Sequence, residues 1–370
     1  MGTPRINYSA PLTLGWVADG VFKNDPFVLI DVGASGGIEG HWRLFEPDLH
    51  AFGFDPLVKE CQRLNDSERN CHVRYYDYFV GTDDYASLHP PSLTGDPIDG
   101  WTPAIYARTS AIAAQRILGM SFERRFNSED PEVVYTERRA SLNAFCREHG
   151  VKNIDFVKID TDGHDYEVLL GATEALRAGQ ALGLFIECQL HGIAHSDSNV
   201  FANIDRLMRE LGFSLFDFEI YRYTRAALPG HFVYTIPAQT REGQVVWGDA
   251  LYLRDAAAPG YSSRWPLHLS PRKLLKLACL FEIYGLPDCA ADLLISRRAE
   301  LADLVDVTKT LDILTREIEP SAISYQTHKR RFETAPTSFY PNPGATDGHL
   351  GITRTMRNLA SRVRRWLRQA

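Results

Sequence analysis

The stretch that decides the fold is Phe27-Val28-Leu29-Ile30-Asp31-Val32-Gly33-Ala34-Ser35-Gly36-Gly37. Its apolar run has the length of a buried parallel strand and is too short for an ordinary helix. The glycines that follow allow a sharp turn and a close approach of a ligand to the backbone. A strand that ends in such a turn is typical of doubly wound α/β proteins that hold nucleotide-like cofactors. The alternative is a buried strand followed by an ordinary glycine turn.

The residue types beside this turn narrow the choice of ligand. The spacing Asp-x-Gly-x-x-Gly differs from the Gly-x-Gly-x-x-Gly that binds a pyrophosphate. Asp31 would repel a phosphate and suits a ligand with cationic or hydroxyl groups. The pattern therefore favours S-adenosylmethionine (SAM), whose sulfonium and amino groups are both positive, over a nicotinamide dinucleotide.

Composition sets the broad class. The chain has 370 residues, of which 44% are hydrophobic and 24% charged, enough for a large catalytic domain and a further region. The formal charge of −7 argues against a general nucleic-acid binder. The six cysteines contain no C-x-x-C pair, which indicates reduced thiols. Because the sequence shows neither a signal-peptide core nor a membrane-spanning run, we expect a cytoplasmic protein.

Alternating apolar runs predict a Rossmann-like α/β fold with a sheet of about seven strands. The expected strands are 27–31, 49–54, 73–80, 133–138, 156–160, 182–187, 213–221, 232–236 and 250–253. The expected helices between them are a short one within 38–47, one up to about Leu64, one around 111–118, 142–149 with Ser141 as its cap, 166–176, and one capped by Asp197 or Ser198.

The expected regions are an N-terminal lead-in (1–25), the cofactor-binding domain (26–255) with an insertion or lid (81–131), a helical appendage (270–320), a linker (321–350) and a basic amphipathic helix (351–370). The insertion is long enough to be a functional lid rather than an idle connection.

Four acids, Asp31, Asp55, Asp160 and Glu187, follow predicted strands. Since ligands of open α/β sheets bind beyond the carboxyl ends of the strands, we expect these acids to line one site. Asp55 comes about twenty residues after the glycine turn, where a carboxylate binds ribose hydroxyls. The alternative is that Asp55 only caps the helix that Pro56 begins.

A second concentration of reactive residues is the segment 158–165, which carries three acids and a histidine. This segment could bind a divalent cation such as Mg²⁺, whereas the alternative is a strand end followed by an acid-rich first helical turn. The expected metal ligands are Asp160, Glu187 and His191. His191 is the best general-base candidate, with His164 and His195 as competitors, although a loop histidine is often only solvated. Cys188 lacks the neighbours of a nucleophile and suits a buried thiol.

The last twenty residues, 351–370, combine apolar residues at helical spacing with six arginines and no acid. A basic amphipathic helix with a tryptophan is typical of binding to an anionic membrane surface. The alternatives are docking onto an acidic surface of the same chain and binding to a partner protein.

With these residues in view, the chain resembles the FkbM family of SAM-dependent methyltransferases over roughly residues 25–255. The resemblance rests on four segments, 29–37, 53–56, 141–145 and, most specifically, 154–172. Two departures stand out: Asp55 replaces a common glutamate, and His164-Asp165 replace a small residue and a glutamate.

The resemblance implies a class I methyltransferase fold and methyl transfer to a hydroxyl, commonly of a sugar, a glycan or a polyketide. It implies that Asp31, Gly33, Ala34, Ser35 and Gly36 hold the methionine part of SAM. It also implies that Asp55 binds the ribose, that Asp77 lies near the adenine, and that Asp160 and Glu187 face the acceptor. Many relatives act in surface polysaccharide assembly, so that glycan-assembly enzymes and the inner face of the cytoplasmic membrane are expected partners.

Two other functions remain open at this point. One is a nicotinamide-dependent oxidoreductase or epimerase acting on nucleotide sugars. The other is a non-catalytic scaffold in a glycan-assembly complex. The four acids at strand ends argue against the scaffold, because a non-catalytic protein would not need them.

Overall fold

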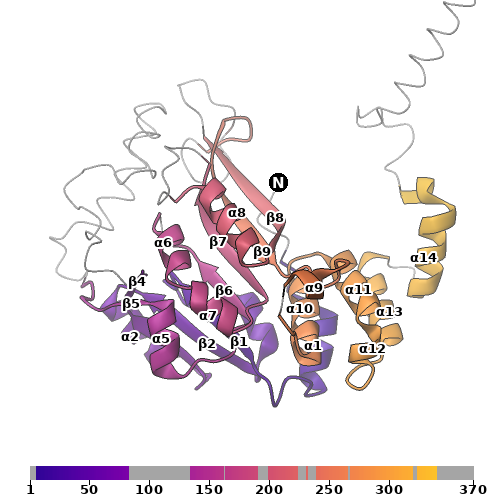
Figure 1. Cartoon of the computed structure of the whole chain (residues 1–370), viewed down its shortest axis with the longest axis horizontal. Coiled ribbons are helices and arrows are strands. Elements are labelled where there is room, and N and C mark those ends of the chain that lie inside the picture. Colours follow the sequence, from indigo (N-terminus) through magenta and orange to yellow (C-terminus); the bar gives the residue numbers. More distant parts are fainter. Residues whose placement is uncertain are drawn as a thin grey trace, which may run out of the picture. The chain divides into compact units, whose positions relative to one another are not determined.

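A seven-stranded sheet forms the centre of the chain (Figure 1). The computed structural model describes residues 6–82, 134–161, 163–190, 199–223, 231, 239–265, 267–319 and 323–339. The strands of this sheet are β1 (Phe27–Val32), β2 (Leu49–Asp55), β3 (Val73–Asp77), β6 (Phe156–Ile159), β7 (Gly183–Gln189), β8 (Ser214–Tyr223) and β9 (Gln244–Leu253).

The strand order is β3-β2-β1-β6-β7-β9-β8, in which β9 runs antiparallel to both β7 and β8 and the other pairs are parallel. The chain builds outward from β1 to β3, then returns to β1 with β6 on its other side. The order therefore reverses between β1 and β6, and ligands of open α/β sheets bind at such a switch point.

One face of the sheet packs against α5 (Leu142–His149), α6 (Asp165–Leu170), α7 (Thr173–Ala178) and α8 (Phe201–Glu210). Apolar residues of alternating strand positions, such as Ile30, Val157 and Leu184, join these helices in one buried cluster. Ser141 caps α5 by accepting a hydrogen bond from the backbone N–H of Ala144, and Gly150 ends the helix in the left-handed conformation, as expected.

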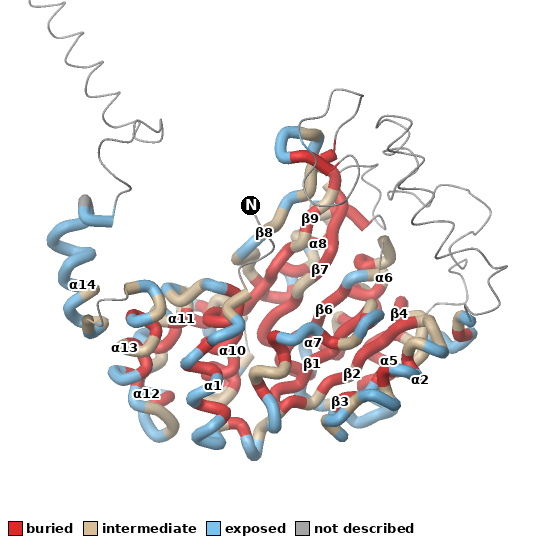
Figure 2. Tube along the Cα trace, turned by 180° about the vertical axis from the view of Figure 1, so that it is seen from behind, coloured by how far each residue is buried: buried red, intermediate tan, exposed pale blue. Residues whose placement is uncertain are grey.

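The opposite face is covered by α1 (Pro11–Ala18), the 3₁₀ helix η1 (Gly40–Phe45) and α10 (Pro271–Ile283). Aromatic rings contribute to this contact: the ring centroids of the stacked pair Phe27 and Phe45 lie 3.9 Å apart, and those of the tilted pair Trp42 and Phe156 lie 4.8 Å apart. The central strands β1, β6 and β7 are almost entirely buried, whereas the edge strand β8 is mostly half-buried (Figure 2).

Buried charges fasten α10 to the rest of the fold. Lys273 and Lys276 reach the fully buried carboxylate of Asp155, at 2.8 and 3.0 Å, just before β6. Glu282 caps α1 by accepting hydrogen bonds from the backbone N–H groups of Leu12 and Thr13. The helices from 270 onwards form the expected C-terminal helical region, and α10 within it also packs against the sheet.

The remaining elements are α2 (Val58–Ser67), β4 (Phe79–Gly81), β5 (Arg139–Ser141), α9 (Tyr261–Arg264), α11 (Pro287–Ser296), α12 (Arg298–Leu301), α13 (Val307–Ile318), α14 (Tyr325–Thr334) and the 3₁₀ helix η2 (Pro336–Phe339). Residues Met1–Leu314 form one compact unit and Thr315–Ala370 a second. No helix in the described ranges is long and apolar enough to cross a membrane.

Several elements differ from the sequence-based expectation. The lead-in 1–25 contains the helix α1, and the linker 321–350 contains α14. The strand expected at 73–80 is divided into β3 and β4, and the one expected at 133–138 is reduced to a bridge at Tyr135. The helix expected at 166–176 is interrupted near Gly171, where any side chain would clash with the backbone of Gly81.

Helix α8 begins at Phe201 after Val200, which makes no side-chain capping bond, and the expected caps Asp197 and Ser198 lie outside the described residues. Most of the expected lid 81–131, the strand 232–236, His191, His195 and the basic segment 351–370 lie outside the described residues.

Candidate active site at the carboxyl end of the sheet

The turn after β1 is held tightly between the ends of β2 and β6. Gly33 has a φ of +89°, and a side chain there would clash with the carbonyl oxygen of Asp160. The backbone N–H groups of Gly33 and Ala34 both donate to the carbonyl of Phe54, at 2.9 Å. Only glycine permits this backbone conformation and this close approach of two strand ends.

The next amides of the turn are also engaged within the protein. The N–H of Gly36 donates to the carboxylate of Glu60 at 2.9 Å, and the N–H of Gly37 donates to Ala34 O at 2.9 Å. A phosphate-binding turn needs several N–H groups directed at the ligand. Here four of these groups bind protein acceptors and a carboxylate already lies beside the turn, which disfavours a pyrophosphate.

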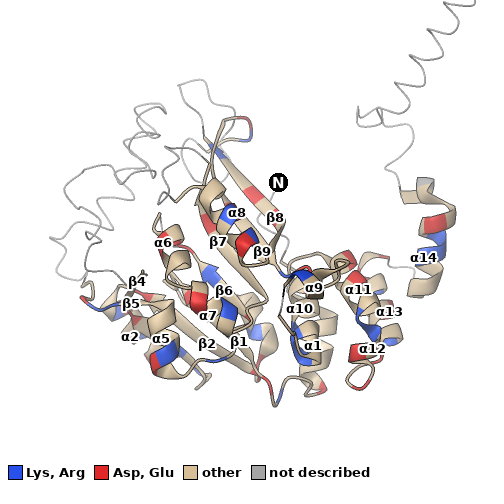
Figure 3. Ribbon diagram, viewed as in Figure 1, with Lys and Arg blue, Asp and Glu red and all other residues tan. Residues whose placement is uncertain are grey.

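Asp31, Lys158 and Asp160 form a charged cluster at the switch point between β1 and β6. Asp31 and Lys158 are direct neighbours in the β1–β6 pairing, and Lys158 Nζ lies 3.5 Å from Asp31 Oδ1 and 3.3 Å from Asp160 Oδ2. Asp31 is 1% exposed at its side chain, whereas Asp160 is 46% exposed. Lys158 therefore joins a buried carboxylate to one that faces solvent. Charged residues stand out on the otherwise mostly uncharged central strands (Figure 3).

Burial dominates the electrostatics of this cluster. It raises the pKa of Asp31 to about 6, although Lys158 acts in the opposite direction. Burial also disfavours charge on Lys158, but the carboxylates of Asp31, Asp160 and Glu39 outweigh it and raise the pKa of Lys158. Near neutral pH Asp31 carries most of a negative charge in a nearly dry position, and such a charge is available to attract a cation.

Asp55 and Asp77 continue the row of acids on the other side of β1. They are direct neighbours in the β2–β3 pairing. Asp55 is 6% exposed and accepts a hydrogen bond from the N–H of Leu57 at 2.8 Å, but the N-cap of α2 is Leu57, so Asp55 does not cap that helix. Asp77 forms an ion pair with Arg138 at 2.9 Å. Asp55 lies at the carboxyl end of β2, where a ribose-binding carboxylate is expected.

Glu187 ends the row beyond β6. It is 7% exposed, and in the antiparallel β7–β9 pairing it lies opposite Asp249. Burial, with the nearby charges of Asp165, Asp160 and Asp249, raises the pKa of Glu187 well above its ordinary value. Burial also raises the pKa of Asp249 to about 7, and Asp249 accepts a hydrogen bond from the Tyr221 hydroxyl at 3.1 Å.

Asp165 has a structural role in the segment after β6. Its carboxylate accepts hydrogen bonds from the N–H and hydroxyl of Thr161, from the N–H of Gly163 and from the side chain of Asn199. These bonds fix the path of the chain directly after Asp160. His164 pairs instead with Glu167, at 3.4 Å.

The structure brings Asp31, Asp55, Asp77, Asp160 and Glu187 to the same end of the sheet, together with the glycine turn. His191 lies outside the described residues, and within those residues no three histidine, cysteine, aspartate or glutamate side chains come together to hold a metal ion. The magnesium site stays a prediction. Cys188 is fully buried, and burial raises the pKa of its thiol above the ordinary value, as suits a structural thiol.

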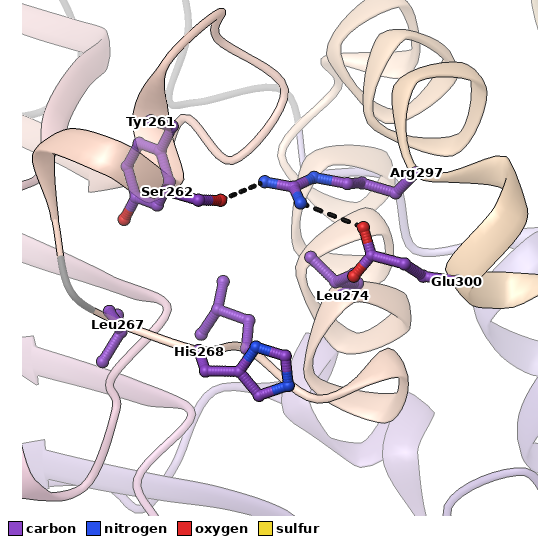
Figure 4. A pocket seen from close by; sticks show the side chains of 8 residues that line it. Tyr261, Ser262, Leu267, His268, Leu274, Arg297 and Glu300 are labelled. Atoms are coloured by element: carbon purple, nitrogen blue, oxygen red, sulfur yellow. Dashed lines mark hydrogen bonds and ion pairs between the residues drawn. The ribbon is translucent and has the colours of Figure 1, made fainter.

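A groove of about 950 Å³ begins at Gly36 and Gly37 and runs along η1 and α2 to His72. A smaller cavity of about 200 Å³ lies among α9, α10 and α12, where Arg297 bonds Ser262 and Glu300 (Figure 4). This second cavity contains none of the predicted site residues, so only the first adjoins the candidate site.

Two features of the candidate site were not predicted from the sequence: the ion pairs of Lys158 and the position of Asp249. The sequence shows Lys158 as a charged residue inside an apolar strand, but it does not show that Lys158 pairs with Asp31 and Asp160. Asp249 gave no local signal, because only the antiparallel pairing of β7 with β9 places it opposite Glu187.

The family profile described as "Methyltransferase FkbM domain" matches residues 31–215. Among solved structures, the chain is similar to magnesium protoporphyrin IX methyltransferase from Synechocystis PCC 6803 with bound SAM, at 12% identity, covering 68% of this chain and 86% of that one, with a TM-score of 0.28. It is also similar to a SAM-dependent methyltransferase from Aquifex aeolicus (9% identity, 66% and 93% covered, TM-score 0.28).

A third similar structure is 1,6-didemethyltoxoflavin-N1-methyltransferase from Burkholderia thailandensis with S-adenosylhomocysteine (11% identity, 67% and 79% covered, TM-score 0.27). No curated protein matches the chain.

Proposed function

The chain belongs to the FkbM methyltransferase family and is a SAM-dependent methyltransferase; from this premise we propose that it methylates a hydroxyl group of a sugar or glycan. The observation that carries the proposal is the row of carboxylates around a glycine turn whose amides are already engaged. Such a site suits a cationic cofactor and a neutral, hydroxyl-bearing acceptor. SAM, when bound, supplies a methyl group activated by its sulfonium.

The residues present fit this cofactor. Asp31 and the turn Gly33–Gly36 would hold the methionine part, because Asp31 offers a buried negative charge to an ammonium group. Asp55 would accept hydrogen bonds from the ribose hydroxyls, and Asp77, beside it on β3, would lie near the adenine. Lys158 holds Asp31 and Asp160 in position.

The acceptor hydroxyl must lose its proton as the methyl group is transferred. We assign this proton to Asp160, because it is the exposed member of the cluster and adjoins the switch point, with His191 as the other candidate. Glu187, whose pKa burial raises well above its ordinary value, would face the acceptor beside Asp160. A Mg²⁺ ion held by Asp160, Glu187 and His191 would lower the pKa of the hydroxyl. Sensitivity to EDTA separates this mechanism from general-base catalysis alone.

A role in surface polysaccharide assembly would explain the basic segment 351–370, which we propose binds an anionic membrane surface and brings the enzyme to other glycan-assembly enzymes. Flotation with anionic liposomes tests this. The full chain should float, and a chain ending at Gly344 should not. Equal flotation of the two would remove the membrane proposal and leave the methyltransferase proposal intact.

The engaged amides of the turn disfavour the nicotinamide-dependent alternative. Calorimetric titration with SAM and with NAD discriminates the two, and failure to bind either would favour the non-catalytic scaffold.

The experiment that tests the proposed reaction is mass spectrometry of candidate glycans incubated with the full chain and labelled SAM. We expect label on a glycan oxygen with the wild-type protein. Asp160→Asn and His191→Ala then identify the proton acceptor: loss of a general base costs about 10²–10⁴-fold in rate. Wild-type rates in both variants would refute the assignment of the base.

A further inference from the structure

Two rows of side chains cross β7, β9 and β8 next to the candidate active site. The strand register places Glu187 opposite Asp249 and Asp249 opposite Glu219, and in the next row Gln189 opposite Trp247 and Trp247 opposite Tyr221. Residues directly opposite in an antiparallel pair point to the same face, and so do residues two apart on one strand. All six side chains therefore project from one face of the sheet.

The most buried members of these rows have polar atoms with no partner. Gln189 is 1% exposed, and neither its amide oxygen nor its amide nitrogen makes a hydrogen bond with any described residue. Glu187 is 7% exposed, and its Oε1 is likewise unpartnered there. A buried polar atom without a hydrogen bond lowers the stability of the fold, so buried polar atoms usually have a partner. A bound ligand could supply hydrogen bonds to Gln189 and Glu187.

The neighbouring row adds an aromatic surface. The rings of Tyr221 and Trp247 stack with centroids 3.8 Å apart, the Tyr221 hydroxyl donates to Asp249, and the Trp247 indole N–H donates to Tyr223 at 3.4 Å. These bonds orient the rings. The negative face of an aromatic ring attracts the weakly positive C–H groups on the flat face of a pyranose.

The charge of the two rows restricts the ligand further. The six side chains include three acids and no base, so they would repel a phosphate or a carboxylate. An amide both donates and accepts, and a carboxyl group binds neighbouring hydroxyls. A neutral ring with several hydroxyl groups satisfies all of these requirements.

We propose that Gln189, Glu187, Asp249, Trp247 and Tyr221 form the acceptor subsite, and that it binds a neutral pyranose whose ring packs on the aromatic pair while its hydroxyls bind the amide and the carboxyls. This inference rests on the proposed function, since the subsite adjoins Asp160: the charge of Asp160 contributes to the raised pKa values of both Glu187 and Asp249. Gln189 and Asp249 are thereby specificity-determining residues for the acceptor.

The test measures binding of methyl α-pyranosides of mannose, galactose, glucose, rhamnose and fucose to the full chain, by saturation-transfer NMR, with and without S-adenosylhomocysteine. The decisive variant is Gln189→Met, which keeps the side-chain volume and removes the polar atoms. The same substitution at the exposed Gln62 on α2 is the matched control. Asp249→Asn is a second variant, because it can still accept the Tyr221 hydroxyl bond.

We expect at least one pyranoside to bind, and Gln189→Met to weaken it about tenfold or more while Gln62→Met leaves it unchanged. We also expect Gln189→Met to melt no lower than the wild type, because it removes unpaired buried groups; a purely structural glutamine would give a lower melting temperature. Unchanged binding in both Gln189→Met and Asp249→Asn, or no binding of any of the five pyranosides to the wild type, would overturn the proposal. A titration with SAM in the same samples keeps the two hypotheses apart, since loss of SAM binding alone counts against the proposed function and not against the subsite.

Discussion

Replacing Asp31 by asparagine should make the protein more stable and bind SAM more weakly. Asp31 is 1% exposed, and burial raises its pKa from 3.8 to about 6. The folded state thus favours the protonated form of Asp31. Above both pKa values the ionised carboxylate destabilises the fold, and this destabilisation disappears as the pH falls below 3.8. Since one pKa unit corresponds to about 1.4 kcal/mol, the cost at pH 8 is about 3 kcal/mol.

Asparagine resembles the protonated carboxyl group and avoids this cost. Chemical denaturation should therefore show Asp31→Asn to be more stable than the wild type by up to about 3 kcal/mol at pH 8 and by about half of that at pH 5. Calorimetry should show SAM affinity reduced by about tenfold or more, because a hydrogen bond to a charged group contributes about 1.5–3 kcal/mol. A variant that is less stable at pH 8, or that binds SAM as the wild type does, would refute this account of Asp31.

Three further predictions concern the same fold. Gly33→Ala should abolish SAM binding in calorimetry and lower the melting temperature, because its side chain would clash with the carbonyl of Asp160; a variant that binds normally would show that the turn is not closed as described. Asp155→Asn should lower the free energy of unfolding by about 3–5 kcal/mol, because it leaves the buried lysines of α10 without their shared carboxylate, and a loss below about 1 kcal/mol would contradict the role given to this cluster. SAM affinity should fall as the pH is lowered through about 6, where Asp31 gains its proton. If the affinity for SAM does not change between pH 8 and pH 5, Asp31 is not the cation-binding group.

Local sequence patterns predicted where the acids on the parallel strands of the candidate site lie. Asp31, Asp55, Asp160 and Glu187 each follow an apolar run, and the carboxyl ends of parallel strands share one edge of the sheet. Their common location therefore follows from the strand pattern alone. The pairing of Lys158 with Asp31 does not follow from the strand pattern, because it requires β6 to lie beside β1. The two residues are 127 apart in sequence, so no local pattern predicts that they are neighbours.

Long-range packing decided the features that sequence analysis missed. The proposed acceptor subsite depends on β9 lying between β7 and β8 in the antiparallel direction, so Asp249 and Gln189 become neighbours of the candidate site only through the strand register. The helices after 270 had no signal for docking on the sheet, because the buried lysines of α10 resemble ordinary surface residues until Asp155 is seen beneath them. The sequence shows the apolar patch in the lead-in, but it does not show that the carboxylate of Glu282 caps the helix α1 formed there.

The most direct test of the central claim is a calorimetric titration of the full chain with SAM, alongside NAD, in the wild type and in Asp55→Ala, with a melting curve to confirm that the variant folds. We expect saturable binding of SAM by the wild type, no binding of NAD, and SAM binding weakened about tenfold or more in the folded variant. Binding of NAD instead of SAM, or SAM binding that does not change in Asp55→Ala, would contradict a cofactor site at the carboxyl ends of β1 and β2.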